Sequence, residues 1–533
     1  MRRHTNRGAY YVLGEEVVRE PDVLGVCGCP FAAANGNQPA DVPLLKFGRL
    51  FGKSSLDPES KEFQDMLKAL VALGQCMNDP QKLGHQPLPP APGPSTISAG
   101  YTYLGQFIAH EITFDSVKEL PEVELTPENV RSPSIDLDSL YGKGPNDESS
   151  KQLYLKSDPA LLKIGATLPL NNFAYPNDLK RDEHGKAVIL DERNDENLAV
   201  AQTQVALIKF HNKVVRRLQA EGHSPADLFD CARMQVVRHF QWIVLHDYLE
   251  KIVDKDVLAA VKTTPLVWFK PDPENVFMPL EFSAAAFRLG HSMVRSEYRW
   301  NDFHAHDEPT SVSPATLKDL FKQTAFSGGI GKSDAAMALP GDWVIDWRRF
   351  FEFENHKINN DHRNRANKID TSFELHLTNS FPAPGIAEEK RALTVRNLLR
   401  GLALSLPTGE QVAAEMVKQG TLTKEQVMTQ DEISAGAQQD ILNAPPLRGN
   451  TPLWYYILRE AELQGKKDRL GPLGSRIVAE TLFGLIQCSP HSIVKTPQWR
   501  PRFTSRHAED GTPIFGMVDL LEFAGVVNPY DVS

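Results

Sequence analysis

Two histidines lie beside residues that could bring them into one chemical site. His110 follows Gln106 by four positions in the segment 103–114, so the two side chains project from one face of a helix. A buried glutamine and histidine need polar partners, and a hydrogen-bonded core histidine would explain the pair equally well. Gly290 has no side chain and leaves room beside His291 for a flat ligand, although a close contact between helices would explain the same glycine.

Two further segments carry charged residues at spacings that fit a site. The loop 191–197 has Arg193 as its one cation and precedes a long helical pattern. Acidic residues are also expected there on electrostatic grounds alone, because they lie near the positive end of the helix dipole. Asn397 and Arg400 lie three apart and share a helical face, as they would on a solvated surface. Each segment alone has a structural explanation, so the case for a site depends on their combination.

In their order along the chain, these segments resemble the animal-type haem peroxidases of the peroxidase–cyclooxygenase superfamily. That family has a Gly-Gln-x-x-x-His helix, an Arg-x-x-Glu loop, an Arg-x-Gly-His segment and an Asn-x-x-Arg segment. The matching residues here are Gln106 and His110, Arg193 and Glu196, Arg288 and His291, and Asn397 and Arg400. The segment 132–142 and the pair His211 and Asn212 also match, so the resemblance spans roughly residues 95–410.

On the proximal side, the resemblance implies a haem b whose iron is bound by His291. The other ring nitrogen of His291 would donate its proton to the Asn397 carbonyl and so hold the ring in place. Arg288 and Arg400 would pair with the haem propionates or brace the proximal side. A proximal histidine held in this way is the ligand set of a peroxidase.

On the distal side, the resemblance implies proton transfer to and from hydrogen peroxide. His110 would take a proton from the peroxide and return it to the leaving oxygen. Arg193 would stabilise the negative charge that develops as the O–O bond breaks. Gln106 would position water or a small anion beside His110. The expected function is a haem peroxidase that reduces hydrogen peroxide and oxidises small organic donors or easily oxidised halides.

The chain departs from the mammalian pattern at the positions that attach the haem. Ala109 stands where mammalian members carry an ester-forming aspartate, so that link cannot form. Glu196 matches the second ester-forming carboxylate, and Asn197 replaces the methionine that makes a third link in myeloperoxidase. We therefore predict at most one covalent bond to the haem, through Glu196, and poor oxidation of chloride.

The family also binds calcium next to the distal helix. Glu111 and an alternating run of oxygen-bearing residues match the calcium positions, and the run consists of Ser132, Ser134, Asp136 and Asp138. Oxygen ligands of this kind suit a hard cation. A capped turn before Tyr141 would use the same residues without a metal.

Two other functions stay open. A fatty-acid dioxygenase of the same superfamily carries a tyrosine three residues before the proximal histidine, where this chain has Arg288. The segment from Tyr298 to Asn301 resembles the dioxygenase Tyr-Arg-Trp-His, but Asn301 replaces the ligand histidine. A non-catalytic haem sensor or carrier needs only the proximal ligand, so the presence of both His110 and Arg193 argues against it.

Composition limits the partners and the compartment. Of the 533 residues, 41% are hydrophobic, and the formal net charge of −10 comes without a basic run, which argues against a nucleic-acid partner. No apolar signal segment follows Met1, and no window has the length of a membrane span. Five cysteines, an odd number, fit a reducing compartment. We expect a soluble protein that is cytoplasmic, or exported without a recognisable signal peptide.

Helices must position these residues. The dominant hydrophobic period is helical, with long amphipathic patterns at 198–219 and 228–251 and shorter ones at 392–404 and 474–487. Period-two alternation, typical of strands, is confined to a few residues at a time. We expect a mainly α protein with little β structure.

One proline-rich stretch divides the chain. Residues 87–94 read Pro-Leu-Pro-Pro-Ala-Pro-Gly-Pro, which favours an extended connector. We expect an N-terminal arm over 1–94 and a single large helical haem peroxidase domain over 95–533.

Overall fold

The computed structural model describes most of the chain from residue 47 onward. The described ranges are 47–54, 56–57, 59–79, 95–113, 134–270, 272, 276–305, 312–332, 336–373 and 387–530, together with two short N-terminal strands. The predicted proline-rich connector at 87–94 lies outside the described residues, as does the whole of 114–133, which includes Ser132. The division into an arm and a domain therefore stays a prediction.

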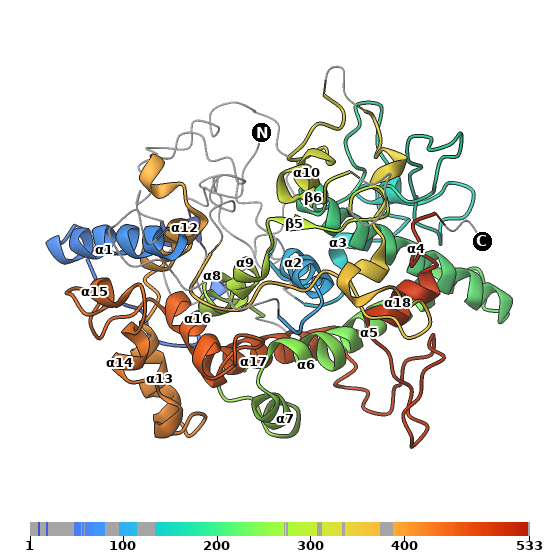
Figure 1. The fold of residues 1–533 in the computed structure, drawn as a ribbon. Coiled ribbons are helices and arrows are strands. Elements are labelled where there is room, and N and C mark those ends of the chain that lie inside the picture. Colours follow the sequence, from blue (N-terminus) through green and yellow to red (C-terminus); the bar gives the residue numbers. More distant parts are fainter. Residues whose placement is uncertain are drawn as a thin grey trace.

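Helices dominate the described residues, as the hydrophobic period predicts (Figure 1). The long helices are α1 (Lys61–Asn78), α2 (Gly100–Ile112), α4 (Leu198–Ala220), α5 (Leu228–Ile243), α7 (Lys255–Thr263), α12 (Leu393–Ala403), α13 (Gly409–Lys418), α16 (Leu453–Leu463), α17 (Pro472–Cys488) and α18 (Met517–Ala524). The short ones are α3 (Asp138–Tyr141), α6 (Leu249–Ile252), α8 (Leu280–Ala284), α9 (Gly290–Met293), α10 (Leu317–Lys322), α14 (Gln430–Ser434) and α15 (Gln439–Leu442).

The strands of the described residues are two residues long and form pairs. The antiparallel pairs are β1 (Ala9–Tyr10) with β2 (Val18–Arg19) and β5 (Glu297–Tyr298) with β6 (Ala315–Thr316). The parallel pair is β3 (Phe47–Gly48) with β4 (Met278–Pro279). Pairs this short cannot form a core of their own, so the helices supply it. The prediction of a mainly α fold with little β structure is confirmed.

Helix α4 begins where its sequence supplies a cap. The Asn197 side chain accepts hydrogen bonds from the backbone N–H of Ala199 at 2.9 Å and of Val200 at 3.4 Å. Such a cap satisfies N–H groups that have no partner within the helix. The predicted helix over 228–251 is continuous, but it contains one π-helical turn, η5 (Val244–Tyr248), between α5 and α6.

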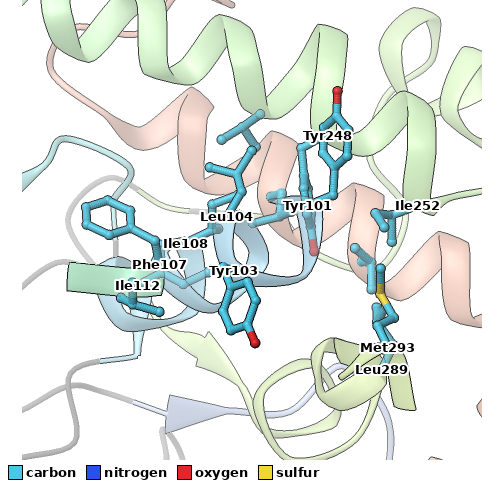
Figure 2. Close-up of a cluster of buried hydrophobic side chains, with 14 of the residues drawn as sticks. Tyr101, Tyr103, Leu104, Phe107, Ile108, Ile112, Tyr248, Ile252, Leu289 and Met293 are labelled. Carbon is cyan, nitrogen blue, oxygen red and sulfur yellow. The ribbon is translucent and has the colours of Figure 1, made fainter. Parts of the chain in front are cut away.

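Helix α2 lies near the centre of the molecule and contacts α4, α9 and η5 (Figure 1). Most of its residues are buried, and the partly exposed ones are Gln106 and Ala109. Figure 2 shows its aromatic and aliphatic side chains beside Tyr248 and Ile252 on one neighbour and Leu289 and Met293 on another. A helix that is apolar on nearly every face must be surrounded by protein, and that position brings it against the other predicted site segments.

Gly105 allows α2 to approach the π-helical turn. A Cβ atom at this position would lie 2.5 Å from the hydroxyl oxygen of Tyr248, which is closer than the two atoms can pack. The absence of a side chain at Gly105 therefore sets the depth of α2, and with it the position of the histidine one turn further along.

None of the helices in the described part of the chain combines the length and the apolar character that crossing a bilayer requires.

We predict that Gly105→Ala lowers the free energy of unfolding by about 1–3 kcal/mol, because the new methyl group overpacks against Tyr248. Thermal unfolding followed by circular dichroism measures this change. Gly401→Ala is the matched control, since its Cβ would meet only Leu406, at an ordinary 3.7 Å. In a Tyr248→Phe background the loss should shrink. Equal melting temperatures for the Gly105 and Gly401 variants would contradict the packing argument.

Candidate functional site

His110 lies in the last turn of α2 and is bonded to a residue that the sequence analysis did not single out. Its Nδ1 atom lies 2.8 Å from Oδ1 of Asn194. Burial, and after it the neighbouring charge of Arg193, lower the pKa of His110 to about 4. The imidazole is therefore neutral near pH 7 and has one lone pair to offer.

Asn194 connects the distal histidine to helix α4. It belongs to the short 3-10 helix η4 (Glu192–Asp195), it is fully buried, and its Nδ2 donates to Oε1 of Gln204 at 2.6 Å. Sequence reasoning missed both residues. Nothing in the spacing of Asn194 and Gln204 marks them, and only the packing of η4 between α2 and α4 brings them to His110.

Gln106 lies on the same helix as His110, as predicted, but it forms a hydrogen bond to Asn197. The Oε1 atom of Gln106 accepts from Nδ2 of Asn197 at 3.2 Å. Asn197 therefore caps α4 with its oxygen and ties that cap to α2 with its nitrogen. An asparagine directly before a helical pattern is a recognisable cap, so sequence could have found this role.

Arg193 lies next to His110, but its guanidinium is held by other groups. Two nitrogens bind the carboxylate of Asp191, with a shortest distance of 2.6 Å, and two donate to the carbonyl oxygens of Thr113 and His110 at 2.7 and 2.8 Å. These carbonyls end helix α2, where a positive charge is favourable. The structure thus places Arg193 behind the backbone of the distal helix, where its charge still acts on the imidazole.

Asp191 and Arg193 form a buried ion pair. Burial alone would raise the pKa of Asp191, but the guanidinium outweighs that effect and lowers the pKa to about 2. Both side chains are nearly inaccessible, with exposed fractions of 2% and 10%. The pair is therefore charged at any pH at which the protein works, and neither charge is screened by solvent.

On the other side, Asn397 lies against His291, the partnership that the sequence predicts. Asn397 Nδ2 is 2.9 Å from Nδ1 of His291, and Arg288 donates to the Asn397 oxygen. The direction of the bond to His291 differs from the prediction, in which the imidazole donates to that oxygen. The reason is that Arg288 already occupies the oxygen, so the amide nitrogen faces the ring.

The environment of His291 also keeps its ring neutral. Burial, followed by the charges of Arg288 and Arg396, lowers the pKa of His291 to about 3. Asn397 and Arg400 are both buried on α12, so the alternative of a solvated charged face is excluded for these two residues.

The donor set and its surroundings fit a haem. Helices α2 and α9 are in contact, so His110 and His291 come from adjacent elements. In both rings, the hydrogen bond among the described residues is made by Nδ1. Neither Nε2 atom belongs to the buried polar atoms that lack a partner in the described residues. A Cβ at Gly290 would meet nothing within 4 Å, so the space that the sequence predicts beside His291 exists. A neutral imidazole beside open space is what an iron ligand requires.

The two positions that the sequence links to haem attachment are both partly exposed. Ala109 directly precedes His110 in α2, and its methyl group cannot form an ester. Glu196 is partly exposed, directly follows η4, and its charge acts on His110. Glu196 is therefore near enough to the distal histidine to influence it electrostatically.

The residues expected to bind calcium form a hydrogen-bonded turn. The Glu111 carboxylate accepts from the backbone N–H groups of Asp138 and Ser139, at 3.0 and 3.2 Å, and from the Ser139 hydroxyl. Asp138 in turn pairs with Arg233 at 2.8 Å. Ser134 donates to Asp136.

This geometry is the capped turn that the sequence analysis left open beside calcium. No cluster of three or more histidine, cysteine or acidic residues suited to a metal is found in the described part of the chain. Ser132 lies outside the described residues. Calcium binding stays a prediction.

The remaining matches to the family pattern have structural roles. Tyr141 and His211 are bonded, with the hydroxyl 3.0 Å from Nδ1, and His211 Nε2 lies 2.8 Å from the carbonyl oxygen of Ala160. Asn212 pairs with the backbone N–H and carbonyl of Leu162. These bonds attach the segment 141–162 to helix α4 and stabilise its position.

The segment that resembles the dioxygenase motif does not supply a ligand. The amide of Asn301 is taken up by the carbonyls of Asp342 and Val344, both at 2.8 Å. Tyr298 is buried, and its hydroxyl accepts from the backbone of Arg295. This segment is therefore structural among the described contacts.

Known sequences are similar to part of this chain. The family model for animal haem peroxidases matches residues 123–338. A peroxidase-like protein of Margaritifera margaritifera is 26% identical over 180 residues, which are 32% of this chain and 22% of that protein. Chorion peroxidase of Drosophila melanogaster is 27% identical over 195 residues, or 33% and 23%. The chain spans less than a quarter of the length of these curated relatives.

Solved structures share the fold. Peroxidase A from Dictyostelium discoideum superposes with a TM-score of 0.55 at 16% identity, covering 86% of this chain and 91% of that one. A fatty acid alpha-dioxygenase from Oryza sativa superposes with a TM-score of 0.53 at 13% identity, covering 90% and 78%. At these identities the likeness concerns the fold alone.

Residues 123–338, which are less than half of the chain, are similar to the animal haem peroxidase family, and the helical fold is shared with solved peroxidase and fatty acid dioxygenase structures. The matched residues include Arg193 and His291 but begin after His110, so the position of His110 beside them comes from the structure.

We predict that Asp191→Asn destabilises the protein by about 3 kcal/mol at neutral pH, because the Arg193 charge stays buried without its partner. The Asp191 pKa is lowered on folding, so the pair stabilises the folded state above the usual value of 3.8 and ceases to do so as the pH falls towards 2. The difference between the two proteins should shrink over that range. Denaturant unfolding measures it. Asp65→Asn removes an exposed ion pair and should change little, and an equal effect of the two substitutions would contradict this account.

Proposed function

We propose that this chain is a haem peroxidase that reduces hydrogen peroxide and oxidises a small organic donor or an easily oxidised halide. The observation that carries the proposal is the pair of neutral imidazoles on adjacent helices, His110 buried and His291 partly exposed, each bonded through Nδ1. When bound, haem supplies the redox-active iron at which the O–O bond is broken. His291 would hold that iron, and His110 would face the peroxide.

His110 would move the proton. A neutral imidazole can accept the proton of hydrogen peroxide and donate it to the oxygen that leaves as water. The low pKa of His110 favours return of the proton, because the imidazolium is disfavoured by burial and by Arg193. Arg193 would act through its fixed positive charge beside the site, since its hydrogen bonds are directed to Asp191 and to backbone.

Arg288 and Asn397 would adjust to the haem together. A haem propionate is the stronger acceptor for Arg288, since it carries a full negative charge and the Asn397 amide does not. Once Arg288 turns to a propionate, the Asn397 oxygen can accept from Nδ1 of His291. The two ends of the amide have nearly the same shape, so this exchange needs only a rotation of the side chain.

We expect His291→Ala to lose haem binding, and His110→Ala to keep haem but to react with peroxide about a hundredfold more slowly or worse. Absorption spectra of the purified proteins before and after addition of hydrogen peroxide measure both effects. His239→Gln is the matched control, because His239 is also a buried histidine but packs against Trp499 and Phe503.

Three results would contradict the proposal, each in its own way. Unchanged spectra in the His110 and His291 variants would remove the site altogether. Haem binding without any reaction with peroxide would favour a sensor or carrier. Oxygen uptake with an unsaturated fatty acid, without peroxide-driven oxidation of phenols, would favour the dioxygenase alternative, whose fold the chain shares.

We propose further that the haem is attached by at most one ester, through Glu196. Acid acetone should release all haem from a Glu196→Gln variant, because no other carboxylate of the family pattern is present once Ala109 replaces the aspartate. Ala109→Asp is the informative partner variant, since it restores the second ester position. Haem that stays with the Glu196→Gln protein after extraction would show that another residue forms the bond.

A further inference from the structure

A short chain of buried amides lies behind His110. Nδ1 of His110 is 2.8 Å from Oδ1 of Asn194, and Nδ2 of Asn194 is 2.6 Å from Oε1 of Gln204. The exposed fractions are 7%, 0% and 2%, so these contacts are shielded from solvent. Three elements meet here, because His110 comes from α2, Asn194 from η4 and Gln204 from α4.

The direction of these bonds determines where the proton of the imidazole lies. The Gln204 oxygen can only accept, so it faces the Asn194 nitrogen, and the Asn194 oxygen is then turned towards His110. An amide oxygen also only accepts, so Nδ1 of His110 must carry the hydrogen. A neutral imidazole has a single N–H, which leaves the lone pair on Nε2.

An uncharged hydrogen-bond partner suits a histidine that must release the proton it has accepted. The charged groups that act on His110 are Arg193, Asp191 and Glu196, whereas the atom in direct contact with Nδ1 belongs to an uncharged amide. A carboxylate in that place would hold the imidazolium by a charge-assisted hydrogen bond. Asn194 orients the ring without trapping the protonated form.

The polar residues predicted from sequence do not perform this task. Gln106 is bonded to Asn197, and Arg193 donates hydrogen bonds to Asp191 and to the backbone carbonyls of Thr113 and His110. We propose that Asn194, supported by Gln204, is the positioning residue that holds His110 in the Nδ1–H form, so that Nε2 is the proton acceptor for hydrogen peroxide. This inference rests on the proposed function for the identity of the proton donor, but the state of the ring can be measured without it.

The first experiment measures the tautomer of His110 directly, in the whole 533-residue chain. The protein is labelled with nitrogen-15 histidine, reduced and treated with carbon monoxide, so that any bound haem is diamagnetic. Long-range proton–nitrogen spectra show which ring nitrogen carries the hydrogen, and His110 is assigned by the signal missing from His110→Gln. We expect hydrogen on Nδ1 and none on Nε2 at neutral pH. Hydrogen on Nε2 overturns the inference, whether or not haem is bound.

Two neighbouring glutamines on α4 provide a matched test of whether Gln204 orients Asn194. Gln204→Leu removes the acceptor that orients Asn194, so a substantial share of His110 should shift to the Nε2–H form. Gln204→Glu keeps an acceptor and should retain the original tautomer. Gln202→Leu is the control, because Gln202 is equally buried but donates to the carbonyl of Asn177. An unchanged tautomer in Gln204→Leu, or the same shift in Gln202→Leu, overturns the role of Gln204.

A charge substitution tests Asn194 by a second readout. Asn194→Asp places a carboxylate at Nδ1, which should raise the pKa of His110 and move the acid limb of cyanide binding to the ferric protein up by at least about one pH unit. Asn212→Asp, which adds the same charge further along α4 beside Leu162, should leave that limb in place. An acid limb that does not move in Asn194→Asp overturns the inference. A chain that binds no haem contradicts the proposed function instead, and the tautomer measurement still stands.

Discussion

The burial of helix α2 is the constraint on which the rest of the site depends. A polar group inside a protein must find a hydrogen-bond partner, and α2 carries several polar side chains into the core. Gln106 meets Asn197, His110 meets Asn194, and Glu111 meets the backbone at the start of α3. Two of these partners come from the loop before α4 and the third from the turn that begins α3. The need to satisfy one buried helix therefore draws both segments to the C-terminal half of α2.

The same burial sets the electrostatics. Both site histidines are neutral because the surrounding protein disfavours a charged ring, and nearby arginines act in the same direction. The distal arginine stays charged because Asp191 pairs with it, and the pair is directed at the carbonyl end of α2. The result is a positive charge beside an uncharged base. That combination suits a site that must accept a proton briefly and stabilise negative charge on a substrate.

The side chains that the sequence predicts as calcium ligands form a hydrogen-bonded turn beside helix α2. The carboxylate of Glu111 is satisfied by backbone N–H groups, and Arg233 supplies a positive charge to Asp138 at 2.8 Å. A guanidinium in that position offsets acidic charge without a metal ion. The family positions for calcium are thus arranged, in the described residues, as a turn that closes on itself.

Many features of the fold and of the candidate site could be predicted from the sequence. The hydrophobic period predicted the long helices, and the spacing of Gln106 and His110 correctly placed both on one helix. The pairing of His291 with Asn397 came from the order of motifs along the chain. These features are local, or are shared by a family, so a linear sequence carries them. The same holds for Ala109, whose identity alone excludes an ester.

What only the tertiary structure decided is which partner each polar group takes. From the sequence we expected Arg193 to act on the peroxide and assigned no role to Asn194. In the structure, Arg193 is paired with Asp191, and Asn194 forms a hydrogen bond with His110. The structure also assigned the Asn397 oxygen to Arg288 instead of His291. The physical reason is that hydrogen bonds depend on distance and direction between atoms far apart in the chain. Sequence by itself determined the helices and the residue types available for chemistry, and packing decided how their donors and acceptors pair.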